Sequence, residues 1–376
     1  MRIAYLLLDP GIGVFGTKGA SVHVQEVIRT FRSLGHEVTV FCTRTDTEVP
    51  ADLADLDVVR LDLPAGLDRG SREVELLRVS DALADLVATQ HPETELVYER
   101  YSLFSTAGAR ISDRLDVPLL LEVNAPLIDE QRTHRGLVHD DHAAAATAVS
   151  FGRARRLVCV SDAVADWVHR EHPGLPDVTV VPNGVDTDRI VPGQGGDGPV
   201  RIGFVGTLKP WHGTDRLLSA CAGLRGPFAL DIVGHGPEAE TLAELAADLG
   251  LGDRVTFHGA LAPAEVPARL RAFDIAAAPY PSGPNYFSPL KVYEYMAAGL
   301  PTVASAVGAL PDLIDGTGLL VPPDDTGALT AALQTLLDDP ALRTRMGDTA
   351  RAQAVANHSW ARRVRDILDP VLQETA

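Results

Sequence analysis

Short apolar runs recur along the chain, separated by glycine-rich or helical stretches. The first run, Arg2–Leu8, is continuous and is typical of a strand buried on both faces. A glycine-rich loop follows, and Ser21–Leu34 then carries apolar residues at helical spacing and ends at Gly35. Because Val38–Cys42 is a second buried run, this segment predicts a strand–helix–strand unit and a parallel sheet.

The same alternation continues and begins again after Pro192–Pro199, whose glycine and proline density predicts a linker. We therefore expect two α/β domains of similar size, with a cleft between them beyond the carboxyl ends of their strands. The stretch from Pro340 to the end is predicted to be helical throughout, with an apolar face. Further predicted strands are Val58–Leu61, Leu96–Tyr98, Leu119–Val123, Leu157–Val160, Thr179–Val181, Val200–Val205, Ala229–Val233, Val255–His258, Ile275–Ala278 and Thr302–Ala304, and further helices are Arg72–Ala88, Ala143–Phe151, Thr214–Leu224 and Glu238–Leu249.

The segment after Ile275–Ala278 combines helix-start residues with a cation and a carboxylate. Ser288 is an N-cap type, Pro289 suits the first helical position and Gly299 suits a left-handed helix end. The helix start, with Lys291 in its first turn, predicts an anion site, and Glu294 one turn later can reach hydroxyls of the same ligand. A phosphate joined to a polyol fits this pattern. A capped buried helix with an incidental ion pair is the alternative.

Three more glycine-containing loops follow predicted strands. The loop from Val205 to Gly213 contains Lys209 and His212, and the loop from Val233 to Glu238 has glycines that allow close backbone approach to a flat ring. In the first domain, Gly16-Thr-Lys-Gly-Ala-Ser21 can close over a phosphate, but its spacing is neither that of a dinucleotide fingerprint nor that of a P-loop.

Charge and cysteine content narrow the class of protein. The chain has 376 residues and a formal charge of −18, and it lacks the basic surface that nucleic acid requires. Lys18, Lys209 and Lys291 are its only lysines, and all three fall in loops or helix starts. Cys42, Cys159 and Cys221 are read as reduced core residues of a cytoplasmic protein, and no apolar run is long enough for stable membrane insertion.

Several motifs together resemble the retaining glycosyltransferases of family 4, nearly from end to end. That family has the GT-B fold, in which two Rossmann-like parallel-sheet domains face each other across a cleft. The resemblance implies an acceptor domain at 1–190, a nucleotide-sugar donor domain at 191–355 and a C-terminal helix at 356–376 that packs back on the first domain. The motifs are Gly-His36-Glu-Val, Val160-Ser-Asp162, Val181-Pro-Asn-Gly-Val-Asp186, Phe204-Val-Gly206, Val233-Gly-His-Gly-Pro237, Val255-Thr-Phe-His-Gly259 and Ser288-Pro-Leu-Lys-Val-Tyr-Glu-Tyr-Met-Ala-Ala-Gly299.

The resemblance also implies roles for individual residues. Glu294 matches the second glutamate of the family's Glu-x7-Glu motif and would hold the ribose hydroxyls. The loop Gly234–Pro237 and the segment His258–Gly259 would line the base pocket, and backbone amides near Ser288–Leu290 would meet the diphosphate. The full donor-binding set is Glu294, Ser288, Pro289, Leu290, Asn285, Tyr286, Phe287, Gly234, Gly236, Gly259, Thr207, Gly19 and Lys18.

The chain departs from the family pattern at several positions. Tyr286 stands where the first glutamate of the motif falls, and Asn285 is the candidate replacement for its sugar contact. Thr207 and His212 replace the usual arginine and lysine, so we expect Lys209 and Lys291 to carry the phosphate charge. Where many relatives have a histidine, this chain has Glu122-Val-Asn124.

We therefore predict an enzyme of the hexosyl-transferring class that moves a sugar from a nucleoside diphosphate, UDP- or GDP-linked, to a hydroxyl of a small soluble acceptor. Lys209, Lys291 and Asn124 are the candidate catalytic residues, and His23 and Glu122 are the candidate acceptor-side residues. The donor is a substrate, and no cofactor is expected. A sugar-nucleotide epimerase on the same fold and a non-catalytic nucleotide-sugar binding protein are the alternatives. The sequence leaves the oligomeric state open.

The candidate metal-binding motifs give only weak support for a metal site. Asp55-x-Asp57 lies among surface acids, and Asp186-x-Asp188 lies in a turn. His139-Asp-Asp-His142 has ligand types but no third partner nearby, and a solvated helix start explains it better. We expect metal-independent transfer.

Overall fold

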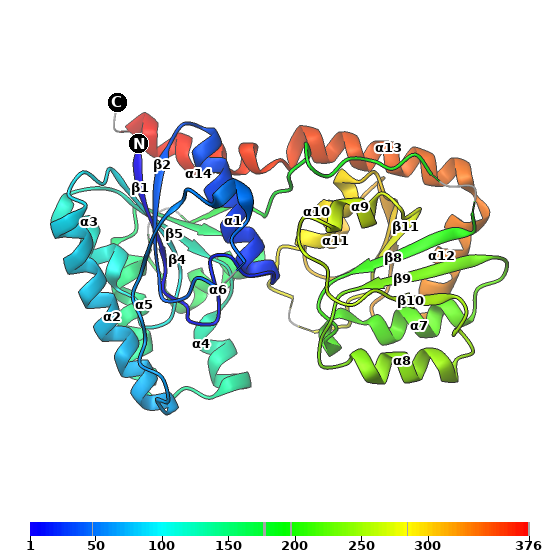
Figure 1. The fold of residues 1–376 in the computed structure, drawn as a ribbon, viewed down its shortest axis with the longest axis horizontal. Coiled ribbons are helices and arrows are strands. Elements are labelled where there is room, and N and C mark those ends of the chain that lie inside the picture. Colours follow the sequence, from blue (N-terminus) through cyan, green and yellow to red (C-terminus); the bar gives the residue numbers. More distant parts are fainter. Residues whose placement is uncertain (47, 176–177, 196–197, 284, 375–376) are drawn as a thin grey trace. The chain divides into compact units, whose positions relative to one another are not determined.

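The computed structural model describes residues 1–46, 48–175, 178–195, 198–283 and 285–374. The chain divides into two compact units, each described here by itself (Figure 1). Unit 1 comprises Met1–Pro182, Tyr286–Ser288 and the described residues from Arg363 onward, and unit 2 comprises Asn183–Asn285 and Pro289–Arg362. The expected division lay after residue 190, with the C-terminal segment beginning at 356. Two residues of the expected linker, Gly196 and Asp197, lie outside the described residues.

Unit 1 is built on a seven-stranded parallel sheet of order β3-β2-β1-β4-β5-β6-β7. Its strands are β1 (Arg2–Leu7), β2 (Glu37–Cys42), β3 (Asp57–Arg60), β4 (Leu96–Arg100), β5 (Leu119–Val123), β6 (Arg156–Cys159) and β7 (Val178–Val180). Its helical segments are α1 (Gly19–Ser33), η1 (Ala51–Leu53), α2 (Arg69–Gln90), α3 (Ala107–Leu115), α4 (Leu127–Glu130), the π-helical η2 (Gln131–Arg135), α5 (Asp140–Arg153) and α6 (Asp162–Glu171).

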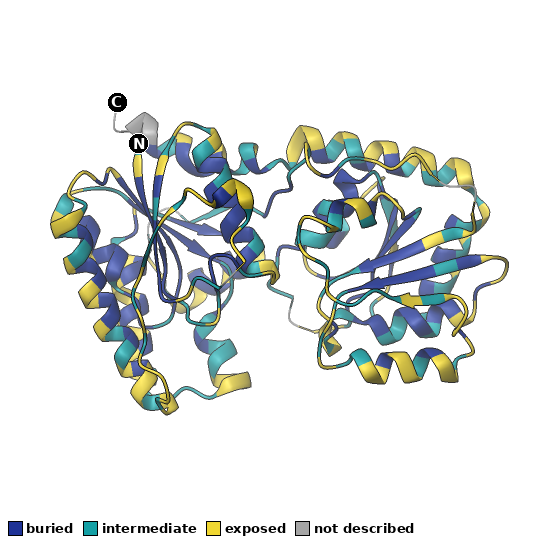
Figure 2. Ribbon diagram, viewed as in Figure 1, coloured by how far each residue is buried: buried dark blue, intermediate teal, exposed yellow. Residues whose placement is uncertain are grey.

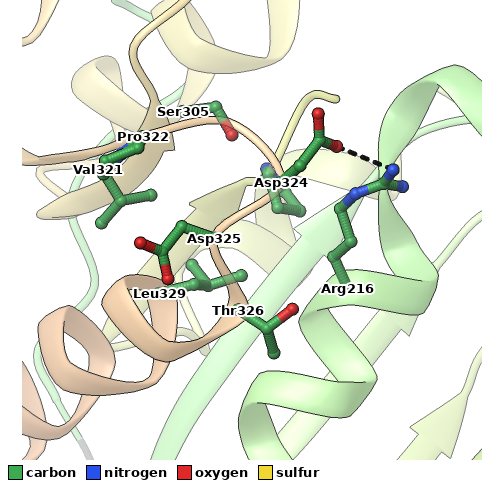
Figure 3. Close-up of a pocket in the computed structure, with 9 residues that line it drawn as sticks. Arg216, Ser305, Val321, Pro322, Asp324, Asp325, Thr326 and Leu329 are labelled. Atoms are coloured by element: carbon green, nitrogen blue, oxygen red, sulfur yellow. Dashed lines mark ion pairs between the residues drawn. The ribbon is translucent and has the colours of Figure 1, made fainter. Parts of the chain in front are cut away.

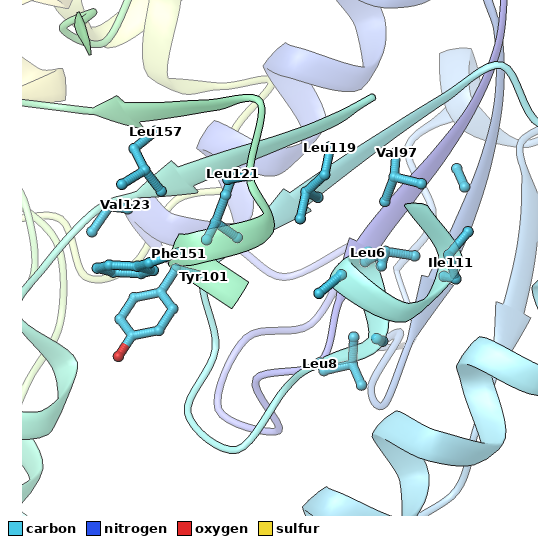
Figure 4. Close-up of a cluster of buried hydrophobic side chains, with 14 of the residues drawn as sticks. Leu6, Leu8, Val97, Tyr101, Ile111, Leu119, Leu121, Val123, Phe151 and Leu157 are labelled. Carbon is cyan, nitrogen blue, oxygen red and sulfur yellow. The ribbon is translucent and has the colours of Figure 1, made fainter. Parts of the chain in front are cut away.

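The main core of unit 1 lies on one face of this sheet. Leu6, Val97 and Leu121 project from three of its strands and pack with Ile111 of α3 and Phe151 of α5 (Figure 4). The other face carries Tyr5 and Tyr98 and is covered by α1, whose Phe31 ring meets Tyr98 edge-on at 5.2 Å. The central strands β1, β4 and β5 are therefore buried on both sides, which explains their continuous apolar runs (Figure 2).

Unit 2 has a six-stranded parallel sheet of order β10-β9-β8-β11-β12-β13. Ile202 and Ile232 of this sheet pack against Leu217 of α7 and Leu333 of α12. Its strands are β8 (Val200–Val205), β9 (Phe228–Val233), β10 (Val255–Phe257), β11 (Ile275–Ala278), β12 (Thr302–Ser305) and β13 (Gly318–Val321). Its helical segments are η3 (Pro210–His212), α7 (Thr214–Ala222), α8 (Ala239–Asp248), α9 (Val266–Leu270), α10 (Leu290–Ala297), α11 (Leu310–Leu313), α12 (Thr326–Asp338) and α13 (Pro340–Asn357), while α14 (Trp360–Glu374) begins in unit 2 and continues into unit 1.

The prediction of uninterrupted helix from Pro340 onward was wrong. Helix α13 ends at Asn357, and Ser359 forms a parallel bridge with Val185. Val185 N–H donates to the carbonyl of His358, and Trp360 N–H donates to the carbonyl of Val185, so the backbone leaves the helix to make these bonds. The predicted apolar face of the last helix is confirmed, because Val364, Ile367 and Leu368 are all buried.

Candidate phosphate site of unit 2

All strands of the unit 2 sheet are parallel, so their carboxyl ends share one edge. A connecting segment leaves that edge after each of the six strands, and this is the edge where ligands of open α/β sheets bind. Two of these segments are hydrogen-bonded together: Leu208 N–H donates to the carbonyl of His235, and Glu238 N–H donates to the carbonyl of Leu208. The glycine-containing loops after β8 and β9 are therefore held together by backbone hydrogen bonds at this edge of the sheet.

Lys291 is the principal cation of this edge. It lies in the first turn of α10, and its Nζ is buried with no hydrogen-bond acceptor among the described residues. The Nζ lies 4.1 Å from the Phe204 ring centroid and 5.3 Å from that of Tyr280. Burial lowers the pKa of Lys291 to about 7, although the Glu294 carboxylate works in the opposite direction. Aromatic faces thus replace the carboxylate that usually accompanies a buried lysine.

Gly206 lets the chain pass close to this amine. Its φ is +155°, and a Cβ at this position would lie 2.7 Å from the Lys291 Nζ and 3.4 Å from His212 Nδ1. A side chain here would therefore displace the amine or the imidazole. The glycine is what allows the loop after β8 to pack directly against Lys291 and His212.

His212 lies against the same glycine and is neutral. Its Nδ1 is within hydrogen-bond distance of the carbonyl of Thr207, and because a carbonyl only accepts, Nδ1 carries the hydrogen. Burial, the charge of Lys291 and that of Lys209 lower the pKa of His212 to about 3, with the Thr207 hydrogen bond acting in the opposite sense. His212 therefore supplies no positive charge to the empty site.

Lys209, the second predicted cation, occupies a different environment. It immediately precedes η3, and its Nζ lies 4.6 Å from the ring centroid of Trp211, a residue that is 56% exposed. Thr207, at the position of the missing arginine, is exposed. The structure thus brings Lys291, His212 and Gly206 together and places Lys209 against an aromatic ring nearby.

Close packing between loops explains why glycine is required at two of the three positions predicted to line the base pocket. A Cβ on Gly234, whose φ is +138°, would lie 1.8 Å from the carbonyl oxygen of Gly206, and one on Gly236 would lie 2.2 Å from that of Leu208. Gly259, with φ +69°, faces open space, and its carbonyl accepts from Gly234 N–H at 2.8 Å. His258 beside it is held by Asp231, a buried carboxylate that also pairs with Arg201.

The entry to α10 differs from the prediction. The helix starts at Leu290 and its N-cap is Pro289, which makes no side-chain cap hydrogen bond, so the assignment of Ser288 as the N-cap was wrong. Ser288 is buried and belongs with Tyr286 and Phe287 to unit 1, where the Tyr286 side chain packs against the core and its carbonyl accepts from Ser161 Oγ. The predicted left-handed helix end is confirmed at Gly299, with φ +67°.

The remaining donor-side residues of this loop are held by local contacts. Asn285 Nδ2 donates to the carbonyl of Gly283 at 2.8 Å. Glu294 is half-buried on α10, one turn after Lys291. The loop after β11 is anchored by Asp324, which lies in a small pocket at the ends of β12 and β13. Asp324 accepts a hydrogen bond from Ser282 N–H and forms an ion pair with Arg216 at 2.7 Å (Figure 3).

The predicted acceptor-side residues of unit 1 form a buried ion pair. His23 Nε2 lies 2.7 Å from Glu122 Oε1, and both side chains are about 3–4% exposed. Burial works to raise the pKa of Glu122, but His23 and Arg100 outweigh it and hold that pKa at about 2. Tyr98 of β4 also interacts with the Glu122 carboxylate and helps to lower its pKa. Tyr5 Oη of β1 and Asn124 Oδ1, one residue after β5, are buried and have no hydrogen-bond partner among the described residues.

The first glycine loop of unit 1 is packed against an acid. Lys18 and Gly19 are exposed at the start of α1. A Cβ on Gly13 would lie 1.9 Å from Asp46 Oδ2, and one on Gly16 would lie 2.5 Å from Ser21 Oγ. Within the part of the chain that the structure describes, no three potential ligands cluster into a metal site. Asp186 is a turn residue, accepting from the backbone of Asp188 and Arg189.

Phe204 and Tyr280, which flank the Lys291 amine, were missed at the sequence level. Each lies near the carboxyl end of a strand, Phe204 in the last residues of β8 and Tyr280 just after β11. This position near a strand end is the feature of the sequence from which they could have been identified as site residues. Tyr295 was also missed; its hydroxyl oxygen accepts from Val205 N–H at 2.9 Å and ties α10 to β8.

The fold, two Rossmann-like parallel-sheet units, is that of the GT-B glycosyltransferases. The family described as "Glycosyltransferase Family 4" matches residues 17–189, and that described as "Glycosyl transferases group 1" matches residues 199–339. A D-inositol 3-phosphate glycosyltransferase of Kineococcus radiotolerans is 31% identical over 93% of this chain and 88% of its own length. One from Acidothermus cellulolyticus is 33% identical over 96% of this chain and 86% of its own.

Solved structures agree on the fold. Sucrose-phosphate synthase from Thermosynechococcus elongatus superposes with a TM-score of 0.76 at 22% identity, covering 100% of this chain and 99% of that one. Anabaena Alr3699/HepE in complex with UDP superposes with a TM-score of 0.74 at 18% identity, covering 99% and 100%. The chain belongs to glycosyltransferase family 4 and is a transferase enzyme. None of its described helices is long and apolar enough to cross a membrane.

Proposed function

We propose that the enzyme transfers a sugar, with retention of anomeric configuration, from a UDP- or GDP-linked donor to a hydroxyl of a small soluble acceptor such as a sugar, cyclitol or secondary metabolite. The observation that carries this proposal is the Lys291 amine, which is buried without an acceptor among the described residues and packs beside the Gly206 backbone after β8. The relatives named for an inositol phosphate support a cyclitol acceptor, and the neighbour solved with UDP supports a uridine donor.

The proposed reaction needs positive charge at the leaving group. The acceptor oxygen forms a bond to the sugar's anomeric carbon, the bond from that carbon to the phosphate oxygen breaks, and the departing phosphate oxygen takes the acceptor proton. Negative charge grows on the diphosphate as its bond breaks. Lys291, Lys209 and the α10 N-terminus would stabilise that charge, and Glu294 would hold the ribose. We keep Asn124 as the candidate group at the sugar, with His23 and Glu122 positioning the first turns of α1.

The donor is identified by a thermal-shift panel of nucleoside diphosphates and their sugars, because a ligand that binds only the folded state raises the melting temperature. The pair that gives the largest shift is then incubated with sugars and cyclitols, and products are analysed by mass. A product heavier than the acceptor by one sugar residue supports transfer. An isomer of the donor with unchanged mass would instead identify an epimerase, and binding without any product would identify a binding protein.

Substitution of the two lysines tests the phosphate assignment. We expect Lys291→Ala and Lys209→Ala each to lower turnover about tenfold or more, the order of one lost transition-state charge contact. Arg254→Ala is the matched control, because Arg254 also lies over an aromatic ring, Phe228, at 4.9 Å, but just before β10, at the opposite edge of the same sheet. Unchanged turnover in both lysine variants would remove the assignment.

A further inference from the structure

The Lys291 amine has an unusual set of neighbours for a buried cation. The walls around it are the rings of Phe204 and Tyr280, and among the described residues no carboxylate forms an ion pair with it. Glu294 on the same helix is the acid that acts on its charge from a distance. The titratable groups that face it from other elements are His212 of η3 and the phenol of Tyr280 after β11. None of them supplies a contacting negative charge.

Among the described residues of the site, no side chain other than Lys291 is placed to gain a proton when an anion arrives. His212 already donates its Nδ1 hydrogen to the carbonyl of Thr207, and it lies close to two lysines that oppose a second proton. Lys209 has its ammonium over Trp211. A proton taken up together with a diphosphate would therefore go to Lys291.

We propose that the site binds its diphosphate ligand together with a proton, Lys291 passing from an amine that is only partly protonated at and above neutral pH in the free enzyme to a full ammonium in the complex. This inference rests on the proposed function, because it requires a nucleoside diphosphate group beside Gly206. It adds that donor affinity falls as the pH rises above neutrality. It also adds that release of the nucleotide from the site returns the proton to solvent.

The size of the effect follows from desolvation. The empty site holds the pKa of Lys291 at about 7, and a doubly negative group in contact with the amine raises it by favouring the charged form. At pH 8 the empty site would carry its proton in about a tenth of the molecules, so binding would take up about 0.9 proton. At pH 6 the amine is already charged, and the uptake would fall to about 0.1 proton.

Isothermal titration calorimetry measures this uptake directly. UDP-glucose, or GDP-mannose if the panel favours guanine, is titrated into the enzyme at pH 8 in HEPES and in Tris, which differ in ionisation enthalpy. The slope of binding enthalpy against buffer ionisation enthalpy gives the protons taken up. Nucleotide sugars are the right probe because their phosphates do not titrate near neutrality. We expect a slope of about 0.9 at pH 8 and about 0.1 at pH 6.

Three variants locate the proton. Lys291→Arg keeps a permanent charge, so its slope at pH 8 should fall to zero while binding persists. Should arginine not fit the buried position, Lys291→Gln should bind more weakly, also with zero slope. His212→Asn should retain the wild-type slope, and loss of the slope in this variant would place the proton on His212 and overturn the assignment.

Failure of this inference is distinguishable from failure of the proposed function. Wild-type enzyme that binds the nucleotide sugar with zero slope at pH 8 would refute the proton uptake and leave the transferase proposal standing. Absence of binding by every nucleotide sugar would refute the donor site itself. Uridine or guanosine, which lack the phosphates, should show no uptake, and a full slope with the nucleoside would place the titrating group outside the phosphate site.

Discussion

Glu99 of unit 1 allows a prediction whose magnitude can be worked out from the structure. Its side chain is buried in β4, where it accepts from Ser105 Oγ–H and from Gly108 N–H and has no cation beside it among the described residues. Burial raises the pKa of Glu99 to about 7. The Glu99→Gln variant keeps the shape: its carbonyl oxygen can accept from Gly108, and its amide can donate to Ser105 Oγ.

The sign follows from proton linkage. Because the folded pKa lies above the unfolded value, the folded state holds the proton more tightly, and stability is lost as the pH rises from about 4.5 to about 7. At about 1.4 kcal/mol for each pKa unit, the ionised carboxylate costs about 3 kcal/mol at pH 8. Glutamine removes that cost. We expect the stability gain of Glu99→Gln over wild type to grow by about 2–3 kcal/mol between pH 5 and pH 8.

Urea unfolding at pH 5, 6.5 and 8, followed by tryptophan fluorescence and circular dichroism, measures the gain. Asp68→Asn is the control, because hydrogen bonds from Ser71 lower the pKa of Asp68 from its ordinary value. The contribution of the Asp68 carboxylate is lost only as the pH falls through that lowered pKa, so the effect of Asp68→Asn should be nearly constant from pH 5 to pH 8. Parallel pH profiles for Glu99→Gln and wild type would refute the reasoning.

Three further outcomes are expected. Gly206→Ala should weaken binding of the nucleotide sugar about tenfold or more in calorimetry, since its Cβ would lie 2.7 Å from Lys291 Nζ, whereas Gly226→Ala, at an exposed left-handed position with open space, should leave binding unchanged. Arg351→Met should lower the unfolding free energy by about 2–4 kcal/mol in urea, because Arg351 donates to the carbonyls of Ile190, Ala297 and Thr187. EDTA should leave turnover unchanged, since lysines and a helix start supply the positive charge; loss of turnover that added Mg²⁺ or Mn²⁺ restores would contradict this.

Most strands were predictable because they lie inside parallel sheets. Strands buried on both faces must be apolar throughout, so runs such as Leu119–Val123 and Ile275–Ala278 were found at their observed bounds. Strand β13 was missed because it lies at the sheet edge, where Leu320 is 41% exposed and the pattern is mixed. The break at Ser359 was missed because it depends on pairing with Val185, far away in the sequence.

The candidate site was partly predictable for a similar reason. Local rules placed Lys291 in the first turn of a helix after a strand, and they placed Gly299 at its end. The aromatic walls were not predictable, because Phe204 and Tyr280 come from separate strands and reach Lys291 only through the packing of β8, β11 and α10. The capping role assigned to Ser288 failed because that residue packs in unit 1 instead.

The sequence by itself determined the two-domain α/β organisation, the glycine loops at strand ends and the positions of the three lysines. Only the tertiary structure decided the environment of each lysine side chain. Lys18 is exposed at the start of α1, Lys209 lies over Trp211, and the Nζ of Lys291 is buried beside the rings of Phe204 and Tyr280. The environment of the ammonium group differs among the three lysines. Its charge is stabilised by water or by contacting groups, and the folding of the chain determines how much water and which groups surround each lysine.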